Sequence, residues 1–268
     1  MRFTLARLLA CLFIAVLAAG CLPEPKPIPT VTTLEMLRTA QYLTQNAPPP
    51  GFERGVQFPR IDDSLSNIPS WHYIVSLSFD GVYAGSEEKA KGMISAEIFS
   101  NELSGERRVL LKASGAVFGS TERDVEGVRI SNDYYLVDQN KVCTKVNDSE
   151  AEKKVADLSA GSLVGGVKNA TPTGERKAIS NFKIWEYTFL PEDVVLPAFD
   201  LSKSGKFTIA AGDLWVSPAD KAVYEYNITL NVENAVLQGD RPLTGQIRAA
   251  YQLLETGTAY NIAIPYGC

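Results

Sequence analysis

Residues 71–79, WHYIVSLSF, decide the fold, because apolar and polar side chains alternate along the whole stretch. The large apolar side chains occupy every second position: Trp71, Tyr73, Val75, Leu77 and Phe79. Successive side chains of a β-strand point to opposite faces, so the stretch predicts a strand with one buried face. His72 belongs to the other set and is expected to point outward, toward solvent.

The same period of two recurs along the chain. It is found in 93–98 (MISAEI), 184–189 (IWEYTF), 223–230 (VYEYNITL) and 246–254 (QIRAAYQLL). Turn-forming Gly, Pro, Asn and Asp residues separate the alternating stretches, at 81–92, 101–105, 131–133, 138–140 and 218–220. Short connections of this kind join antiparallel strands, so the sequence predicts an antiparallel meander.

Two segments have helical periodicity instead. Residues 32–46, TTLEMLRTAQYLTQN, predict an amphipathic helix that is capped at Thr33 and ended by the prolines at 48–50. A polar, irregular stretch to Pro69 follows. Residues 148–161 predict a short helix with a Ser149–Glu152 capping box. The predicted fold class is therefore α+β: a strongly curved antiparallel sheet, or half-barrel, whose concave face is covered by helices.

The N-terminus predicts export. Arg2 and Arg7 precede an apolar run at 8–17, and the small residues 18–20 lead directly to Cys21. This order is typical of a bacterial lipobox, in which the cysteine becomes the first mature residue and carries diacylglycerol and palmitate. An ordinary secretory signal, cut near Ala19 or Gly20, is the alternative. Residues 1–20 are thus predicted to be a signal peptide and Cys21 a lipidation site.

Residues 21–31 predict a stiff tether, because proline occupies positions 23, 25, 27 and 29. Removal of residues 1–20 would change the net charge from −5 to −7, which argues against a nucleic-acid partner. With 45% hydrophobic and 21% charged residues, the remaining chain can form a normal core. The expected location is the outer face of the cytoplasmic membrane, at the cell surface or in a periplasm, with the membrane contacted through the acyl anchor.

Cysteine use fits an oxidising compartment. Cys11 lies in the predicted signal and Cys21 is the anchor, which leaves Cys143 and Cys268. A disulfide between these two would tie the chain end to a central strand. Two unpaired cysteines are the alternative.

The sequence offers little catalytic chemistry. His72 is the single histidine, so sites that need several imidazoles are excluded. The stretch 161–169, GSLVGGVKN, lacks the spacing of a phosphate loop and predicts a flexible connector. Acidic pairs lie in predicted loops or at a helix start, at 62–63, 87–88, 150–152 and 192–193, and a calcium site from Asp62, Asp63 and Asp80 has no EF-hand spacing. We therefore predict a protein that is not an enzyme and has no metal and no cofactor.

At the level of pattern the chain resembles the LolA/LolB-like and LppX/LprG-type lipid carriers. The resemblance is carried by the lipobox, the N-terminal helix, the meander and the interposed helix, and by GDLWVSPADKAVYEYNITL (212–230) and GQIRAAYQLLETGTAYNIAIP (245–265). It covers about Thr32 to Pro265. It implies that 32–268 form one half-barrel domain whose cavity, between sheet and helices, holds acyl chains.

An aromatic inner face is the candidate binding site. The predicted ligand-binding residues are Trp71, Tyr73, Phe79, Trp185, Tyr187, Phe189, Tyr224 and Tyr226. Either they line a cavity that binds or transfers lipid or glycolipid, at about 0.8 kcal/mol per buried methylene, or they fill a closed core. In the second case the protein would be a non-enzymatic envelope interaction or stress-sensing module, with a membrane-protein partner bound at the rim or at residues 48–70.

Overall fold

The computed structural model describes residues 36, 38, 47–119, 122–146, 150–179, 182–237 and 241–268. The chain divides into two compact units, Met1–Gln45 and Asn46–Cys268. The predicted signal peptide, Cys21 and the tether lie outside the described residues. Of the helix predicted at 32–46, only Met36 and Arg38 are described, and both are helical. In the described part of the chain, no helix is both long enough and apolar enough to span a membrane.

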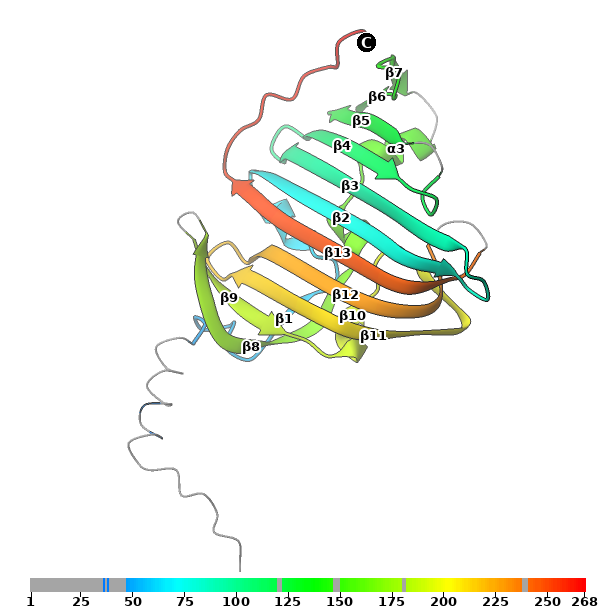
Figure 1. Cartoon of the computed structure of the whole chain (residues 1–268). Helices are drawn as coiled ribbons and strands as arrows, with labels where there is room; N and C mark the ends of the chain where they lie inside the picture. The colour runs from blue at the N-terminus through cyan, green and yellow to red at the C-terminus, as the bar shows by residue number, and fades with distance from the viewer. Residues whose placement is uncertain are drawn as a thin grey trace, which may run out of the picture. The chain divides into compact units, whose positions relative to one another are not determined.

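The second unit is built on one 13-stranded antiparallel sheet (Figure 1). Its strands are β1 (Val56–Phe58), β2 (Ser70–Tyr83), β3 (Lys89–Asn101), β4 (Glu106–Ser114), β5 (Arg123–Ile130), β6 (Asp133–Val137), β7 (Cys143–Val146), β8 (Gly166–Ile179), β9 (Phe182–Thr188), β10 (Val194–Val195), β11 (Asp200–Ser217), β12 (Ala222–Val236) and β13 (Leu243–Thr256). Their order across the sheet is β1-β8-β9-β11-β12-β13-β2-β3-β4-β5-β6-β7, and β10 pairs with β8. The antiparallel strands predicted from the period of two are confirmed.

The order shows how the chain builds the sheet. From β2 in the middle, the chain runs outward by hairpins to β7 at one edge. It then crosses to β8 near the other edge and returns through β9, β11 and β12 to β13, which pairs with β2 (Figure 1). The segment predicted to be helical at 148–161 belongs to the connection that crosses from β7 to β8. Two antiparallel runs, joined at β13 and β2, therefore form the sheet.

The predicted α+β class, with helices covering the concave face of a half-barrel, is wrong. From Ala47 onward, the described residues contain two short α-helices, α3 (Glu150–Ala156) and α4 (Ala160–Val164), and two 3-10 turns, η2 (Asp63–Asn67) and η3 (Pro191–Asp193). Such short elements cannot cover a 13-stranded sheet, which is open at β1 and β7. The fold is mainly β.

Local signals explain why no long helix forms between β7 and β8. The side chain of Ser159 accepts a hydrogen bond from the Ser162 N–H, so α4 begins afresh after α3 has ended. Gly165, with φ of 76°, ends α4, and a Cβ there would lie 2.1 Å from the Val195 carbonyl oxygen. The flexible connector predicted at 161–169 is instead the buried end of α4 and the start of β8. The predicted Ser149–Glu152 box lies outside the described side chains.

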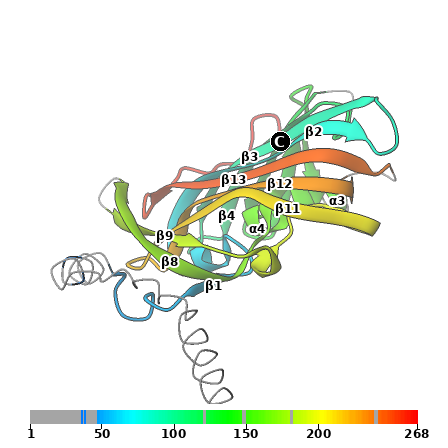
Figure 2. The same cartoon turned by 60° about the horizontal axis from the view of Figure 1, so that its bottom comes forward.

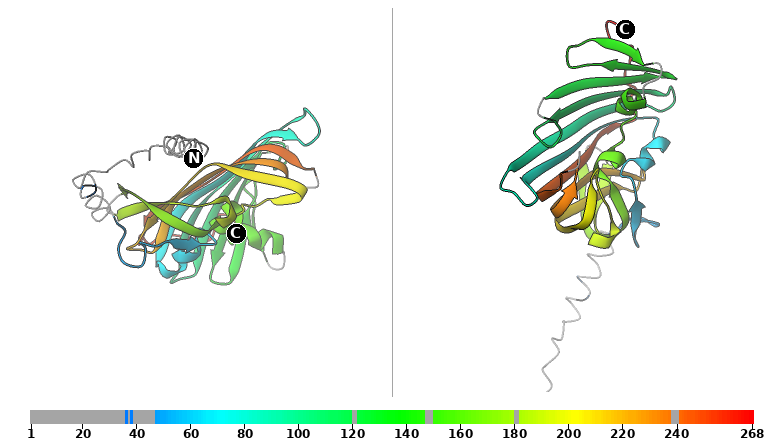
Figure 3. Two further views of the ribbon diagram at one scale, coloured as in Figure 1. Left: turned by 90° about the horizontal axis from the view of Figure 1, so that it is seen from below. Right: turned by 90° about the vertical axis from the view of Figure 1, so that its right-hand side faces the viewer.

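Segments that were expected to be irregular cover part of the inner face of the sheet. In the right-hand view of Figure 3, β1, η2 and the short helices lie on one side of the long strands. β8 curves away from these strands, and β1 follows the same curve because it pairs with β8 (Figure 2). Phe58, Ile61 and Leu65 are buried in the same core as Tyr73. The stretch between Gly51 and Pro69 is largely turn and coil outside β1 and η2, as predicted, but some of its side chains contribute to the core.

The centre of the inner face is filled by large side chains. Among the largest fully buried residues are four tyrosines, Tyr73, Tyr187, Tyr226 and Tyr251. Tyr226 stands opposite Tyr251 in the β12–β13 register, and Leu214 stands between Tyr226 and Tyr187. Each tyrosine buries a large apolar area, so this row supplies much of the packing in the middle of the sheet.

The tyrosine row predicts a steep loss of stability in alkali. Burial raises the pKa of Tyr187 to about 12, and it also raises the pKa values of Tyr73, Tyr226 and Tyr251 above their ordinary value. In the unfolded chain the phenols ionise at their ordinary pKa near 10. The stabilisation is therefore complete below pH 10 and is lost as the pH rises toward the folded-state values.

We expect the part of the tyrosinate absorbance that comes from these four buried tyrosines to appear above pH 10 in the same transition as the loss of the near-ultraviolet circular dichroism signal. Titration of these phenols near pH 10, with the fold intact, would contradict their burial. Brief exposure at each pH followed by return to neutrality serves as the control for base damage.

Candidate functional site

An apolar pocket of about 530 Å³ lies at one end of the sheet. Its apolar lining consists of Pro49, Pro50, Phe52, Phe182, Trp185, Pro218 and Ala219. Lys183 and Lys221 complete the lining. The volume falls within the range of about 300–1,000 Å³ that is usual for small-molecule sites, and the aromatic and proline lining is typical of sites for apolar ligands.

Two neighbouring strands and one turn form the floor of this pocket. Trp185 of β9 stands opposite Val216, near the end of β11. The chain then turns through 218–221 into β12, so the turn is held beside Trp185. Asp220 accepts hydrogen bonds from the Tyr224 hydroxyl (2.6 Å) and the Ser217 hydroxyl (3.4 Å). These contacts fix the turn that carries Pro218 and Lys221.

The turn at 49–52, which precedes β1, forms the remaining side of the pocket. The Phe52 N–H donates to the Pro49 carbonyl at 3.1 Å, which closes the turn. The Tyr187 hydroxyl donates to the Phe52 carbonyl at 3.0 Å and thereby ties the turn to β9. The sequence predicted the prolines at 48–50 only as a helix stop. Their place beside Trp185 depends on pairing between distant strands, and no local pattern indicates it.

Two lysines give the pocket a positive rim. Lys183 and Trp185 are two residues apart on β9 and so belong to the same face of the strand. Lys183 and Lys221 are both exposed, and the side chain of neither forms an ion pair or a hydrogen bond with another described residue. The nearby carboxylates are Glu53, in the adjoining turn, and Asp220, which is engaged by Tyr224.

The predicted ligand-binding aromatics are divided between this pocket and the core. Trp185 lines the pocket. The other seven pack in the protein: Trp71, Tyr73, Phe79, Tyr187, Tyr224 and Tyr226 are buried, and Phe189 is half-buried. The rings of Trp71 and Tyr73 stack at 4.9 Å, and those of Phe189 and Tyr226 lie 6.0 Å apart. Sequence periodicity identified the inner face but did not distinguish packed side chains from those at its open end.

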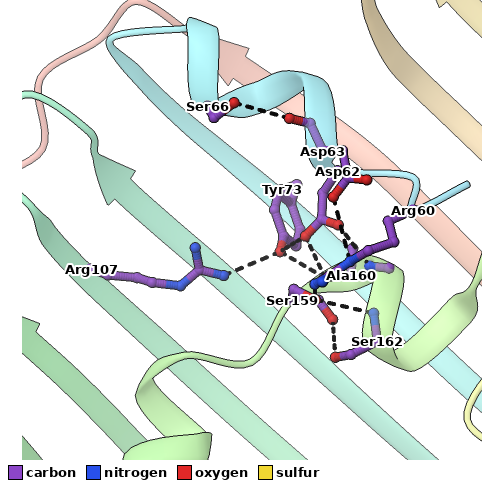
Figure 4. A network of polar contacts seen from close by, with 10 residues as sticks. Arg60, Asp62, Asp63, Ser66, Tyr73, Arg107, Ser159, Ala160 and Ser162 are labelled. Carbon is purple, nitrogen blue, oxygen red and sulfur yellow. Dashed lines mark hydrogen bonds and ion pairs between the residues drawn. The ribbon is translucent and has the colours of Figure 1, made fainter. Parts of the chain in front are cut away.

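A buried polar network lies on the inner face near α4 (Figure 4). Asp62 accepts hydrogen bonds from the N–H groups of Ala160 (2.7 Å) and Gly161 (2.9 Å) and from the Tyr73 hydroxyl (3.1 Å). Arg107 donates to the Leu158 carbonyl and to the Tyr73 hydroxyl. Burial, followed by the charge of Asp62, raises the pKa of Tyr73, so its hydroxyl stays a donor. The network fastens the 59–69 segment and α4 to β2.

His72, predicted to point outward, lies on the outer face but is not free there. Its Nε2 is 2.8 Å from Glu97 Oε1, and its ring stacks on Phe99 with centroids 4.0 Å apart. Tyr260 packs edge-on against both rings. The C-terminal tail therefore half-buries this side chain, which the strand pattern alone could not show.

The disulfide between Cys143 and Cys268, one of the two alternatives from the sequence, is present, with Cα atoms 5.3 Å apart. Asn101 holds the tail on the way, because it accepts from the Tyr260 N–H at 3.0 Å and donates to the Tyr260 carbonyl at 2.7 Å. Ile262 packs with Val128 and Tyr135 in a small second core. The C-terminal tail, residues 257–268, thus forms a strap across the outer face of the strands from β3 to β7.

The predicted carboxylate pairs are dispersed. Asp62 belongs to the buried network, Asp80 pairs with Lys91, and Glu88 pairs with Arg241. Among the residues that the structure describes, no three His, Cys, Asp or Glu side chains are grouped as metal ligands. The arrangement at the pocket therefore offers apolar contact and positive charge rather than acid–base chemistry.

Comparison with known proteins gives no family. No protein-family model matches the chain, and no curated protein matches it. An uncharacterized conserved protein from Thermus thermophilus aligns over 82% of this chain and 88% of its own, with 9% identity and a TM-score of 0.26. A DUF1329 family protein from Desulfovibrio piger aligns over 76% and 92%, with 9% identity and a TM-score of 0.21. Similarity this weak supports no conclusion about fold or function.

Proposed function

We propose that the protein is a membrane-anchored lipoprotein that binds or transfers lipid, related to the LolA/LolB-like and LppX/LprG-type carriers. The pocket beside Trp185 is the observation that carries this proposal. Burial of ten methylenes of an acyl chain would contribute about 8 kcal/mol before the costs of ordering. Apolar walls, without acid–base groups between them, suit binding rather than catalysis.

The proposed place is the outer face of the cytoplasmic membrane, with Cys21 as the acylated anchor. The Cys143–Cys268 disulfide supports an exported location, because disulfides persist in oxidising compartments. An acyl anchor at Cys21 would keep the protein at a membrane, where acyl chains are available as ligands.

Replacement of Ala219 by Trp tests the proposal. Ala219 is an exposed residue of the β11–β12 turn that lines the pocket, so a tryptophan there is expected to fill the pocket without disturbing the core. We expect lipid that copurifies with the full-length protein from its own host, measured by organic extraction and mass spectrometry, to fall severalfold. Ala116→Trp, in the exposed turn after β4, is the matched control and should leave the lipid content unchanged.

The filled inner face favours a second candidate, the non-enzymatic interaction module. Tyr226 and Tyr251 are fully buried where a central cavity was expected. Under this alternative, no acyl lipid copurifies with the wild-type protein, and Ala219→Trp instead weakens capture of a membrane-protein partner by cross-linking in cells. Lipid that copurifies and is lost on filling the pocket would exclude it.

A further inference from the structure

The two lysines at the pocket indicate which lipids it selects. We propose that Lys183 and Lys221 make the pocket specific for a single acyl chain with an anionic head group, a carboxylate or a phosphate. This inference rests on the acyl-chain site proposed above and adds a choice of head group. The apolar walls would bind the acyl chain, while the two lysine side chains would bind the anionic head group at the rim of the pocket.

The charge distribution around the pocket supports an anionic head. The whole chain has a net charge of −5, yet the charged side chains that line this pocket are both lysines. Four other described lysines are neutralised by ion pairs: Lys91 pairs with Asp80, Lys141 with Asp124, Lys145 with Asp133, and Lys177 with Glu225. Lys183 and Lys221 have no such partner among the described residues.

The two lysines come from separate elements, and each is positioned by the backbone beneath it. Lys183 is fixed by the pairing of β9 with β8, where it stands opposite Ala178. Lys221 lies in the β11–β12 turn with φ of 55°, in the left-handed region, and the Asp220 contacts described above brace that turn. The Asp220 carboxylate accepts from the Tyr224 hydroxyl, and neither Asp220 nor Glu53 lines the pocket, so the charged side chains that line it are the two lysines.

Contact quenching provides a direct test. The full-length protein is reconstituted in phosphatidylcholine nanodiscs and titrated with brominated sixteen-carbon chains that carry a carboxylate, a phosphate or an uncharged glycerol head. Bromine quenches indole fluorescence by contact, and Trp185→Phe identifies the part of the signal that comes from the pocket. We expect both anionic chains to bind more tightly than the neutral one.

Charge removal separates the head group from the chain. We expect Lys183→Gln/Lys221→Gln to weaken binding of the anionic chains about tenfold and to leave the neutral chain unchanged. Lys183→Arg/Lys221→Arg should retain the preference. The matched control is Lys203→Gln/Lys206→Gln, two exposed lysines at the opposite end of β11. Raising the salt from 0.1 to 1 M should also reduce the preference, because the screening length falls from about 10 Å to about 3 Å.

The outcomes distinguish this inference from the proposed function. Equal affinity for anionic and neutral chains, with quenching at Trp185, would overturn the head-group selection and leave the acyl site standing. An equal loss in the Lys203/Lys206 control would also overturn it, because general surface charge would then be responsible. Absence of Trp185 quenching by any chain would overturn both. Preference for only one of the two anionic heads supports the inference and narrows the ligand to carboxylates or phosphates.

Discussion

Loss of the Cys143–Cys268 disulfide is expected to lower the free energy of unfolding by about 3–5 kcal/mol. The bond joins residues separated by 125 positions, and cross-linking so long a loop removes much of the entropy of the unfolded chain. A typical domain is stable by only about 5–15 kcal/mol, so the change is a large fraction of the total. Denaturant unfolding of Cys143→Ser/Cys268→Ser, compared with the oxidised wild type, measures it.

The same variant should loosen the C-terminal strap. Without the bond, the tail is held by the Asn101 contacts to Tyr260 and by Ile262 in the second core. We expect hydrogen exchange to increase in residues 257–268 first, and in β6 and β7 beneath them. The reduced wild type should behave like the double variant. Equal stability of oxidised and reduced protein would show that the tail does not constrain the fold.

Five strands, β2, β3, β9, β12 and β13, were predictable because each has its own local pattern, whereas the long strands β8 and β11 were not predicted from such a pattern. WHYIVSLSF is buried on alternate positions over its whole length, and β12 and β13 repeat the pattern. The period of two acts over neighbouring residues and needs no knowledge of partners. Strand order is different: the pairing of β13 with β2 depends on contacts between the two ends of the domain, and no local pattern indicates it.

The helical cover was predicted wrongly for a physical reason. The apolar residues at 155 and 158 have helical spacing, but Ser159 caps a new helix and Gly165 stops it. Short strands fill part of the space instead. β1 and β10 are only 3 and 2 residues long, and both depend on β8 for their hydrogen bonds. Segments of that length contain too few residues for a periodic signal.

The pocket and the buried network escaped prediction because each joins remote positions. Lys183 and Lys221 are ordinary surface lysines until β9 and the β11–β12 turn are placed together. Asp62 looked like one of two loop carboxylates, yet it accepts from an N–H group 98 positions away. The side chain of its neighbour Asp63 makes an exposed ion pair with Arg60. Sequence alone has no means of ranking the two.

Asp62→Ala should therefore destabilise the protein far more than Asp63→Ala. Removal of the Asp62 carboxylate leaves the Gly161 N–H without its acceptor and takes one acceptor each from Ala160 and Tyr73. Unsatisfied buried donors cost about 1–3 kcal/mol each, and Asp62 is partly exposed, so we expect a loss of about 2–3 kcal/mol. Asp63→Ala, its matched control, should cost less than about 0.5 kcal/mol, because exposed ion pairs contribute little.

The position of the segment that Asp62→Ala destabilises is as informative as the loss of unfolding free energy. Asp62 holds the N-terminal end of α4, and Arg107 holds the Leu158 carbonyl just before it. In Asp62→Ala, we expect the amides of residues 160–165 to exchange faster with solvent before the sheet itself opens, as local unfolding of a segment that has lost its fastening. Asp62→Asn should be intermediate, because one carboxamide oxygen can replace only one of the two carboxylate oxygens that accept here. Equal exchange in the Asp62 and Asp63 variants would mean that packing of Leu163 and Val164, rather than the carboxylate, keeps α4 on the sheet.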